Sequence, residues 1–221
     1  MFKNWRELIK PKRLQVDAET LTATYGKFSA EPFERGFGTT MGNALRRVLL
    51  SSLQGAAITS VRIKGVLHEF STVPGVTQDV TDIILNLKGV LIQLHGHEPR
   101  NIRIVKKGAG VIKAGDIITD SNVEILNPDH FIATCGKEAE IEIDMVVTMG
   151  KGYGPAERNR DEKAPVGTIP IDALFSPIKK VNYTVSNARV GQVTDYDKLV
   201  LEIHTNGSVK PDDALAYAAK I

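Results

Sequence analysis

The feature that most constrains the fold is an alternation of apolar and polar residues in the middle of the chain. Ile141, Ile143, Met145 and Val147 occupy every second position within residues 139–148. Because successive side chains of a strand point to opposite faces, this period predicts a strand with one buried face. The same alternation recurs over residues 14–24, 59–64, 101–106 and 198–204. Strands are therefore expected to dominate the chain.

Three other segments have the apolar spacing of a helix, namely residues 40–53, 77–88 and 212–220. Thr39 or Thr40 could cap the first helix, and its core stripe is expected to consist of Met41, Ala44, Leu45, Val48 and Leu49. Asp79 lies near the start of the second, and Gly89 follows its end. Because few strands alternate one for one with helices, a parallel sheet with helical crossovers is disfavoured. We therefore predict an α+β fold.

Charge and cysteine content limit the functional class. The 28 Lys and Arg residues against 26 Asp and Glu residues give a formal net charge of +2, so the overall charge does not favour a dedicated nucleic-acid or membrane binder. The single cysteine, Cys135, is expected to be a buried, inert thiol in a reducing compartment. Residues 1–6 lack the apolar core of a signal peptide, and no later run is long enough to span a membrane. We expect a cytoplasmic protein with no membrane partner.

Two glycine-rich segments have some features of phosphate-binding loops. Residues 36–42 lead into the first helix, but their glycines have the wrong spacing for a dinucleotide or nucleoside-triphosphate loop. Residues 149–154 follow a strand and enter a polar stretch up to residue 170, which we interpret as a long, exposed and flexible loop. An enzyme or small-molecule binder that uses residues 36–42 stays open as the alternative class.

Candidate catalytic and metal-binding groups are isolated in the sequence. His95 and His97 would share one face of a strand, without a clear third ligand. The serines, histidines and acidic residues show no local pairing of a nucleophile with a base. We expect no catalytic residue, no metal site and no cofactor.

The segment around the first helix carries a specific family resemblance. Residues 34–52 read ERGFGTTMGNALRRVLLSS and closely resemble the signature segment of bacterial RNA polymerase alpha subunits. The resemblance covers essentially the whole chain and continues through residues 65–72, 75–80, 85–89, 150–153, 172–177 and 194–199. It departs after Tyr153, where charges of both signs replace the more acidic loop of some relatives, so a regulator contact at that loop stays open.

The resemblance implies a division into two subdomains. Residues 1–54 and 177–221 would form a dimerisation subdomain, and residues 55–176 a mostly β subdomain inserted between them. Family members also carry a flexible linker and a small DNA-binding domain, and this chain ends before both, within an apparent helix. No direct sequence-specific DNA contact is therefore expected of it.

The resemblance also implies partners. Such a subunit is a non-catalytic homodimer on which RNA polymerase is assembled, first by addition of the beta subunit and then of beta prime. Residues that match Arg47 and Leu50 contact beta in the family. Residues that match Lys88 and Ile171 lie in the region that beta prime contacts.

A helical wheel separates these roles on the first helix. Leu45, Val48 and Leu49 cluster on the core side, while Arg47 and Leu50 lie together on the opposite side. Apolar residues of the first and last helices are expected to form the dimer interface: Leu45, Val48, Leu49, Leu53 and Leu215.

Overall fold

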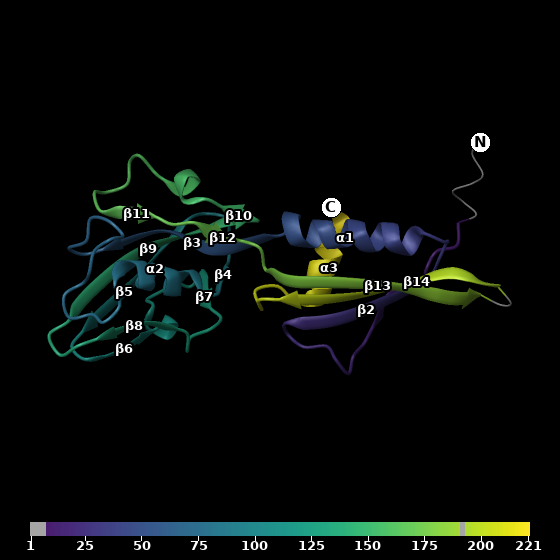
Figure 1. The fold of residues 1–221 in the computed structure, drawn as a ribbon, viewed down its shortest axis with the longest axis horizontal. Coiled ribbons are helices and arrows are strands. Elements are labelled where there is room, and N and C mark those ends of the chain that lie inside the picture. The colour runs from purple at the N-terminus through teal and green to yellow at the C-terminus, as the bar shows by residue number, and fades with distance from the viewer. Residues whose placement is uncertain (1–7, 191–192) are drawn as a thin grey trace. The chain divides into compact units, whose positions relative to one another are not determined.

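The structure is a computed structural model that describes residues 8–190 and 193–221. The N-terminal residues 1–6, considered above for a signal peptide, lie outside the described part. The described chain has three α-helices and many antiparallel strands, so the predicted α+β class is confirmed. It divides into two compact units, one made of residues up to Leu53 with Pro177–Ile221, and the other of Gln54–Ser176 (Figure 1).

The first unit places two helices on one antiparallel sheet. The strand order is β1-β2-β14-β13, and the two longest strands, β13 and β14, form a hairpin along which α1 runs (Figure 1). Its elements are β1 (Gln15–Val16), β2 (Tyr25–Phe33), α1 (Phe37–Ser52), β13 (Ile178–Val190), β14 (Val193–Thr205) and α3 (Pro211–Lys220). Phe28 of β2, Leu49 of α1, Ile203 of β14 and Leu215 of α3 meet in the core between helices and sheet. The core therefore joins both ends of the chain.

The strand expected over residues 14–24 is wrong in extent, because only Gln15–Val16 is extended and paired there. The main strand of this region is β2, whose buried positions include Gly26 and Ala30. Phe28 between them is the only large buried residue of the strand, so the hydrophobic alternation is weak and the pattern missed it. A Cβ on Gly26 would lie 2.7 Å from Cβ of Pro211, so the start of α3 requires a glycine at this point of the sheet.

The second unit is built on a four-stranded antiparallel sheet with the order β11-β3-β9-β5. Its larger elements are β3 (Gln54–Ile63), α2 (Val80–Lys88), β5 (Arg100–Lys107), β9 (Glu140–Lys151) and β11 (Thr168–Pro170). The smaller strands are β4 (Ile92–Leu94), β6 (Gly110–Lys113), β7 (Val123–Ile125), β8 (Phe131–Cys135), β10 (Tyr153–Gly154) and β12 (Ala173–Leu174). Two 3-10 turns, η1 (Ala114–Asp116) and η2 (Ala156–Asn159), complete it.

The alternation in β9 works as predicted. Ile141, Ile143, Met145 and Val147 are all buried in the core of this unit, and burying each such side chain stabilises the fold by about 1.5–3 kcal/mol. Cys135 is buried in the same core, and burial raises the pKa of its thiol, which keeps the thiol protonated. The prediction of a buried thiol is therefore confirmed.

The segment of residues 149–170 is more ordered than expected. Strand β9 extends to Lys151, β10 pairs with β12, and β11 pairs with β3. The glycines serve close packing, because a Cβ on Gly150 or Gly154 would lie 2.6 Å or 2.9 Å from the ring of Phe175. The interpretation of this segment as a flexible loop is therefore wrong for residues 149–154.

Candidate interaction surfaces

The N-terminus of α1 is capped by a residue distant in sequence. The helix begins at Phe37 with Gly36 at the cap position, so the expected cap by Thr39 or Thr40 is wrong. The Asp197 carboxylate of β14 instead accepts hydrogen bonds from the backbone N–H groups of Gly36 (2.8 Å) and Gly38 (3.0 Å). A carboxylate is favourable at this positive end of the helix dipole. Two of the amides that an anionic ligand could use are therefore already bonded to a carboxylate.

Glycines also fix how α1 lies on the hairpin. A Cβ on Gly38 would lie 2.9 Å from the Val185 side chain, and one on Gly42 would lie 2.6 Å from the Tyr183 ring. Arg46 adds a tether, because its Nε donates to the Val181 carbonyl at 3.2 Å. These contacts set the rotation of α1 about its axis, and with it the direction of every other side chain.

With that rotation fixed, α1 has three faces. Successive residues of a helix are about 100° apart around its axis. On this spacing α1 has one face against the sheet, one around Met41 and one around Arg47, roughly 120° from each other. The sheet face holds Gly38, Gly42 and Leu49, which are buried. The second face holds Phe37, Met41, Ala44 and Val48, and the third holds Arg47 and Leu50.

The second face is apolar although it is largely exposed. Phe37 and Met41 are 44 % and 40 % exposed, and the spacing from Phe37 through Met41 and Ala44 to Val48 is that of a helix-pairing seam. Tyr217 of α3 and Ile221, the residue that follows the helix, are also exposed. The prediction of a core stripe is therefore wrong for Met41 and Ala44, which are exposed, because the sheet contacts the neighbouring face of the helix.

The predicted dimer residues occupy two different environments. Leu49, Leu53 and Leu215 are buried in the core of their own unit, so their side chains do not reach its surface. Leu45 and Val48 are half-buried against that core. Leu45 and Val48 are therefore accessible enough to contact a partner directly. The other three residues lie in the core below the exposed face of α1 and can only stabilise it.

The third face of α1 combines a charged and an apolar side chain. Arg47 and Leu50 are both exposed, as the helical wheel predicted. None of the described residues hydrogen-bonds to or forms an ion pair with the Arg47 guanidinium; its backbone carbonyl accepts from Ser51. Arg47 therefore differs from its neighbour Arg46, which is tied to β13.

The other predicted contact residues, Lys88 and Ile171, lie in the second unit. Lys88 ends α2, whose N-terminus is capped by the Asp79 side chain through the backbone N–H of Asp82 at 2.7 Å. The Lys88 ammonium forms an ion pair with Asp172. This hydrogen bond from Lys88 is the main reason that the pKa of the Asp172 carboxyl lies below its ordinary value.

Ile171 is not a surface residue. Its side chain is 3 % exposed within the core, its N–H donates to the Thr59 carbonyl at 2.9 Å, and its carbonyl accepts from Asn159 at 2.8 Å. The structure brings Lys88 and Ile171 together only through Asp172, which follows Ile171 in the chain. A partner at this surface would meet Lys88 and Asp172, with Ile171 beneath them.

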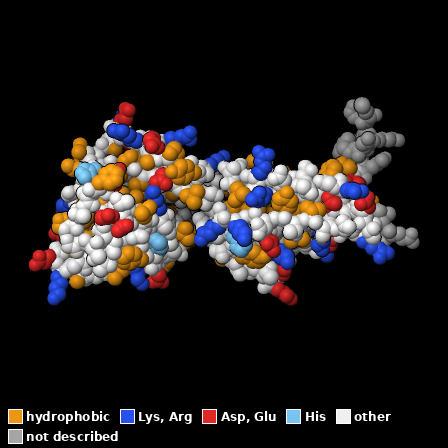
Figure 2. Space-filling model, viewed as in Figure 1, with side chains coloured by type: hydrophobic (Ala, Val, Ile, Leu, Met, Phe, Trp, Pro, Cys, Tyr) orange, Lys and Arg blue, Asp and Glu red, His pale blue; other side chains and the backbone are white. Residues whose placement is uncertain are grey.

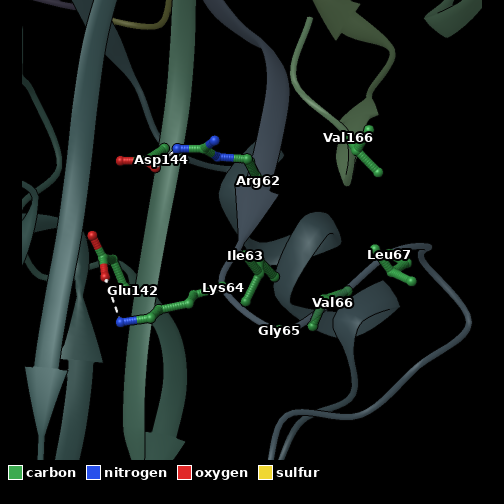
Figure 3. A pocket seen from close by; sticks show the side chains of 9 residues that line it. All are labelled: Arg62, Ile63, Lys64, Gly65, Val66, Leu67, Glu142, Asp144 and Val166. Carbon is green, nitrogen blue, oxygen red and sulfur yellow. Dashed lines mark hydrogen bonds and ion pairs between the residues drawn. The ribbon is translucent and has the colours of Figure 1, made fainter.

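A groove on the second unit has charges that are already matched (Figure 3). Its volume is about 600 Å³, and Leu67 and Val166 contribute apolar surface. Arg62 pairs with Asp144 at 2.6 Å, and Lys64 pairs with Glu142 at 3.4 Å. Burial raises the pKa of Asp144, but hydrogen bonds from arginine outweigh this and lower it overall. Because its cations are neutralised internally, the groove has little attraction for an anion.

Charges of both signs are also mixed elsewhere on the surface. On the face shown in Figure 2, blue and red side chains alternate without forming a continuous basic stripe. Among the described residues, no helix is long and apolar enough to cross a membrane. The same residues contain no group of three or more His, Cys, Asp or Glu side chains that could hold a metal ion.

The α+β fold with exposed helix faces is that of a protein that binds other chains, and comparison with known families shows which family it belongs to. Residues 61–176 match a family model described as the RNA polymerase Rpb3/RpoA insert domain. Three proteins named DNA-directed RNA polymerase subunit alpha align with all 221 residues, with 75 % identity in Geobacter metallireducens, 72 % in Pelobacter propionicus and 61 % in Syntrophus aciditrophicus. The chain belongs to the family of bacterial RNA polymerase alpha subunits. It spans 64–65 % of the length of these relatives.

Proposed function

We propose that this chain is a non-catalytic scaffold of bacterial RNA polymerase, which homodimerises and nucleates assembly of the beta and beta prime subunits for DNA-templated transcription. The observation that carries the proposal is the three-faced helix α1. A helix that only stabilised its own unit would need a single apolar face. The sheet uses one face of α1, and two further faces with distinct chemistry are left exposed.

The apolar seam of α1 is assigned to a second copy of the chain. Phe37, Met41 and Val48 have the spacing with which helices pack in pairs. Tyr217 of α3 and Ile221 after its end add apolar area. A two-fold dimer brings the same patch of both copies together and is the commonest symmetric assembly. Such a dimer presents every remaining surface twice, so two different large subunits can bind chemically identical protomers.

The face of Arg47 and Leu50 is assigned to beta. Arginine combines a planar hydrogen-bonding fork with an apolar stem, and it is enriched in the centres of interfaces. The Arg47 guanidinium has no partner among the described residues, so it is free to bind a carboxylate or carbonyl of another chain.

The surface around Lys88 is assigned to beta prime. Lys88 and Asp172 are the groups that a partner would touch, at 31 % and 36 % side-chain exposure. Ile171 is buried, so it would contribute to this surface by fixing the position of Asp172 and not by contacting beta prime itself. This assignment keeps both predicted residues but gives them different roles.

The rival function, nucleotide or other small-molecule binding at residues 36–42, is disfavoured by Asp197, which occupies the amides of Gly36 and Gly38. We propose that the chain uses no cofactor, makes no direct sequence-specific DNA contact and acts in the cytoplasm. A saturating nucleotide would stabilise a nucleotide-binding protein by mass action. The proposal predicts an unchanged melting temperature.

Stepwise reconstitution with purified beta and beta prime tests the assignments. Arg47→Ala should leave the dimer intact but lose the beta complex, because truncating a central interface arginine commonly costs about 2 kcal/mol or more, roughly 30-fold in affinity. Lys88→Ala should allow the dimer–beta complex to form and impair the later addition of beta prime. Gel filtration separates these stages.

Arg46→Ala is the matched control. It removes the adjacent arginine and its bond to the Val181 carbonyl, so it should lower fold stability while the folded protein still binds beta. If Arg47→Ala binds beta with wild-type affinity, or dissociates the dimer, the assignment of the Arg47 face is wrong.

A further inference from the structure

The C-terminal turn of α2, which carries Lys88, is held by a side chain from the turn before β8. His130 Nε2 lies 2.9 Å from the Asn86 carbonyl oxygen. A carbonyl oxygen can only accept, so Nε2 carries a proton and donates the hydrogen bond. The Asn86 side chain in turn donates to the Ile132 carbonyl of β8 at 2.8 Å. Since the last carbonyls of a helix have few partners within it, these bonds tie the end of α2 to its surroundings.

A second side chain of the same turn holds the residues that follow Lys88. Asn127 donates through Nδ2 to the Gly89 carbonyl at 2.9 Å, and its Oδ1 accepts the Leu91 N–H at 2.8 Å. The Leu91 carbonyl accepts the Leu126 N–H at 2.9 Å. Side chains therefore hold the backbone both before and after Lys88.

Gly89 leaves the space that His130 needs. A glycine at the end of a helix often serves a left-handed backbone conformation. Gly89, however, has φ of −80° in the right-handed region, which any residue can adopt. A Cβ on Gly89 would lie 2.6 Å from His130 Nε2. The glycine is therefore explained by the close approach of the imidazole and not by the conformation of the chain.

We propose that His130 and Asn127 are positioning residues that fix the direction of Lys88 for beta prime. The inference rests on the proposed assignment of Lys88 to beta prime. Helix ends fray, and a frayed last turn would let the Lys88 side chain point in several directions. With the turn held, Lys88 keeps its ion pair with Asp172 and loses less conformational freedom when a partner binds it. Both positioning side chains are half-buried, and they act through the backbone of α2.

His130→Ala in the full chain tests this role. The affinity of the dimer–beta complex for beta prime should fall about 3- to 10-fold, the size of one hydrogen bond, while binding of beta stays unchanged. Amide hydrogen exchange of Gly89 and Val90 should accelerate, because their N–H groups donate to carbonyls of the same turn. Asn127→Ala should act in the same direction.

Three control variants separate the hydrogen bond from bulk and from stability. The amide nitrogen of glutamine can take the place of Nε2, so His130→Gln should recover most of the affinity. The asparagine side chain is one carbon shorter, so His130→Asn should not, and equal losses in both variants would contradict the role of the donor. Ile141→Val removes one methylene from the core of the same unit, so it should lower the unfolding midpoint without weakening the binding of beta prime.

Combination with Lys88→Ala distinguishes positioning from direct contact. If His130 acts through Lys88, His130→Ala should cost no further affinity in the Lys88→Ala background. The inference is overturned if His130→Ala alone binds beta prime with wild-type affinity, if its loss persists in that background, or if Ile141→Val weakens binding equally.

Failure of the assignment of Lys88 gives a different pattern. If Lys88→Ala itself binds beta prime normally, the assignment is wrong and the positioning role fails with it. His130→Ala would then leave the affinity unchanged while it still accelerates the exchange of Gly89 and Val90. Unchanged exchange of these two amides would instead show that His130 does not hold the turn, which overturns the inference whatever Lys88 contacts.

Discussion

Replacing Asp197 should destabilise α1 from a distance of some 160 residues along the chain. Asp197→Ala removes a cap, which costs about 0.5–2 kcal/mol, and a charge at the helix N-terminus, which costs about 0.3–1 kcal/mol. Gly36 is exposed, so water can replace the lost bond there, whereas Gly38 is buried and its N–H would be left unsatisfied. We expect a total loss of about 2–3 kcal/mol, or a fall in melting temperature of roughly 5–10 °C for a chain of this size.

Two companion variants make the test specific. Asp195→Ala removes a neighbouring carboxylate that pairs at 3.5 Å with Arg35, both largely exposed, so it should change stability by less than about 0.5 kcal/mol. Asp197→Asn keeps an acceptor oxygen and should recover part of the loss. Thermal unfolding and amide hydrogen exchange of Gly36 and Gly38 measure the effect. If Asp197→Ala behaves like Asp195→Ala, the capping argument is refuted.

Three further predictions follow from packing and charge. Gly42→Ala should destabilise by about 1 kcal/mol or more, because the clash with Tyr183 outweighs the helix propensity of alanine, and urea unfolding measures it. Ile171→Ala should cost about 2–5 kcal/mol and Lys88→Ala less than about 1 kcal/mol, since only the first opens a core cavity; the same titration compares them. The pKa of Asp144 is lowered by folding, so its stabilisation is present above the unfolded pKa of about 3.9 and is lost as pH falls through the folded value; acid titration of Asp144→Asn should show a weaker loss.

The sequence predicted those parts of the fold in which large apolar residues repeat. The alternation in β9 and the stripe of α2 both depend on side chains such as Ile143 and Leu87, whose burial dominates the stability of their elements. Strand β2 was missed because Phe28 is its only large buried residue, and a pattern of hydrophobicity does not register the small buried residues Gly26 and Ala30 on either side of it. The capping of α1 by Asp197 could not be predicted from the sequence, because α1 and β14 come together only in the folded chain.

The candidate surfaces show the same limit. Arg47 and Leu50 were predicted to face away from the core because helical geometry determines direction once one face is known. Burial of Ile171 could not be derived, since its neighbours Thr59 and Asn159 come from other elements. An apolar residue such as Leu49 or Leu53 could equally well face the core or a partner, and only the positions of the sheet and α3 determine that both are internal.

The most direct test of the central claim is the mass of the complex between this chain and purified beta, measured by light scattering during gel filtration. A dimeric scaffold predicts one complex with two copies of the chain and one of beta, which then accepts beta prime without loss of either copy. A complex with a single copy, or no complex at concentrations of tens of micromolar, would contradict the account.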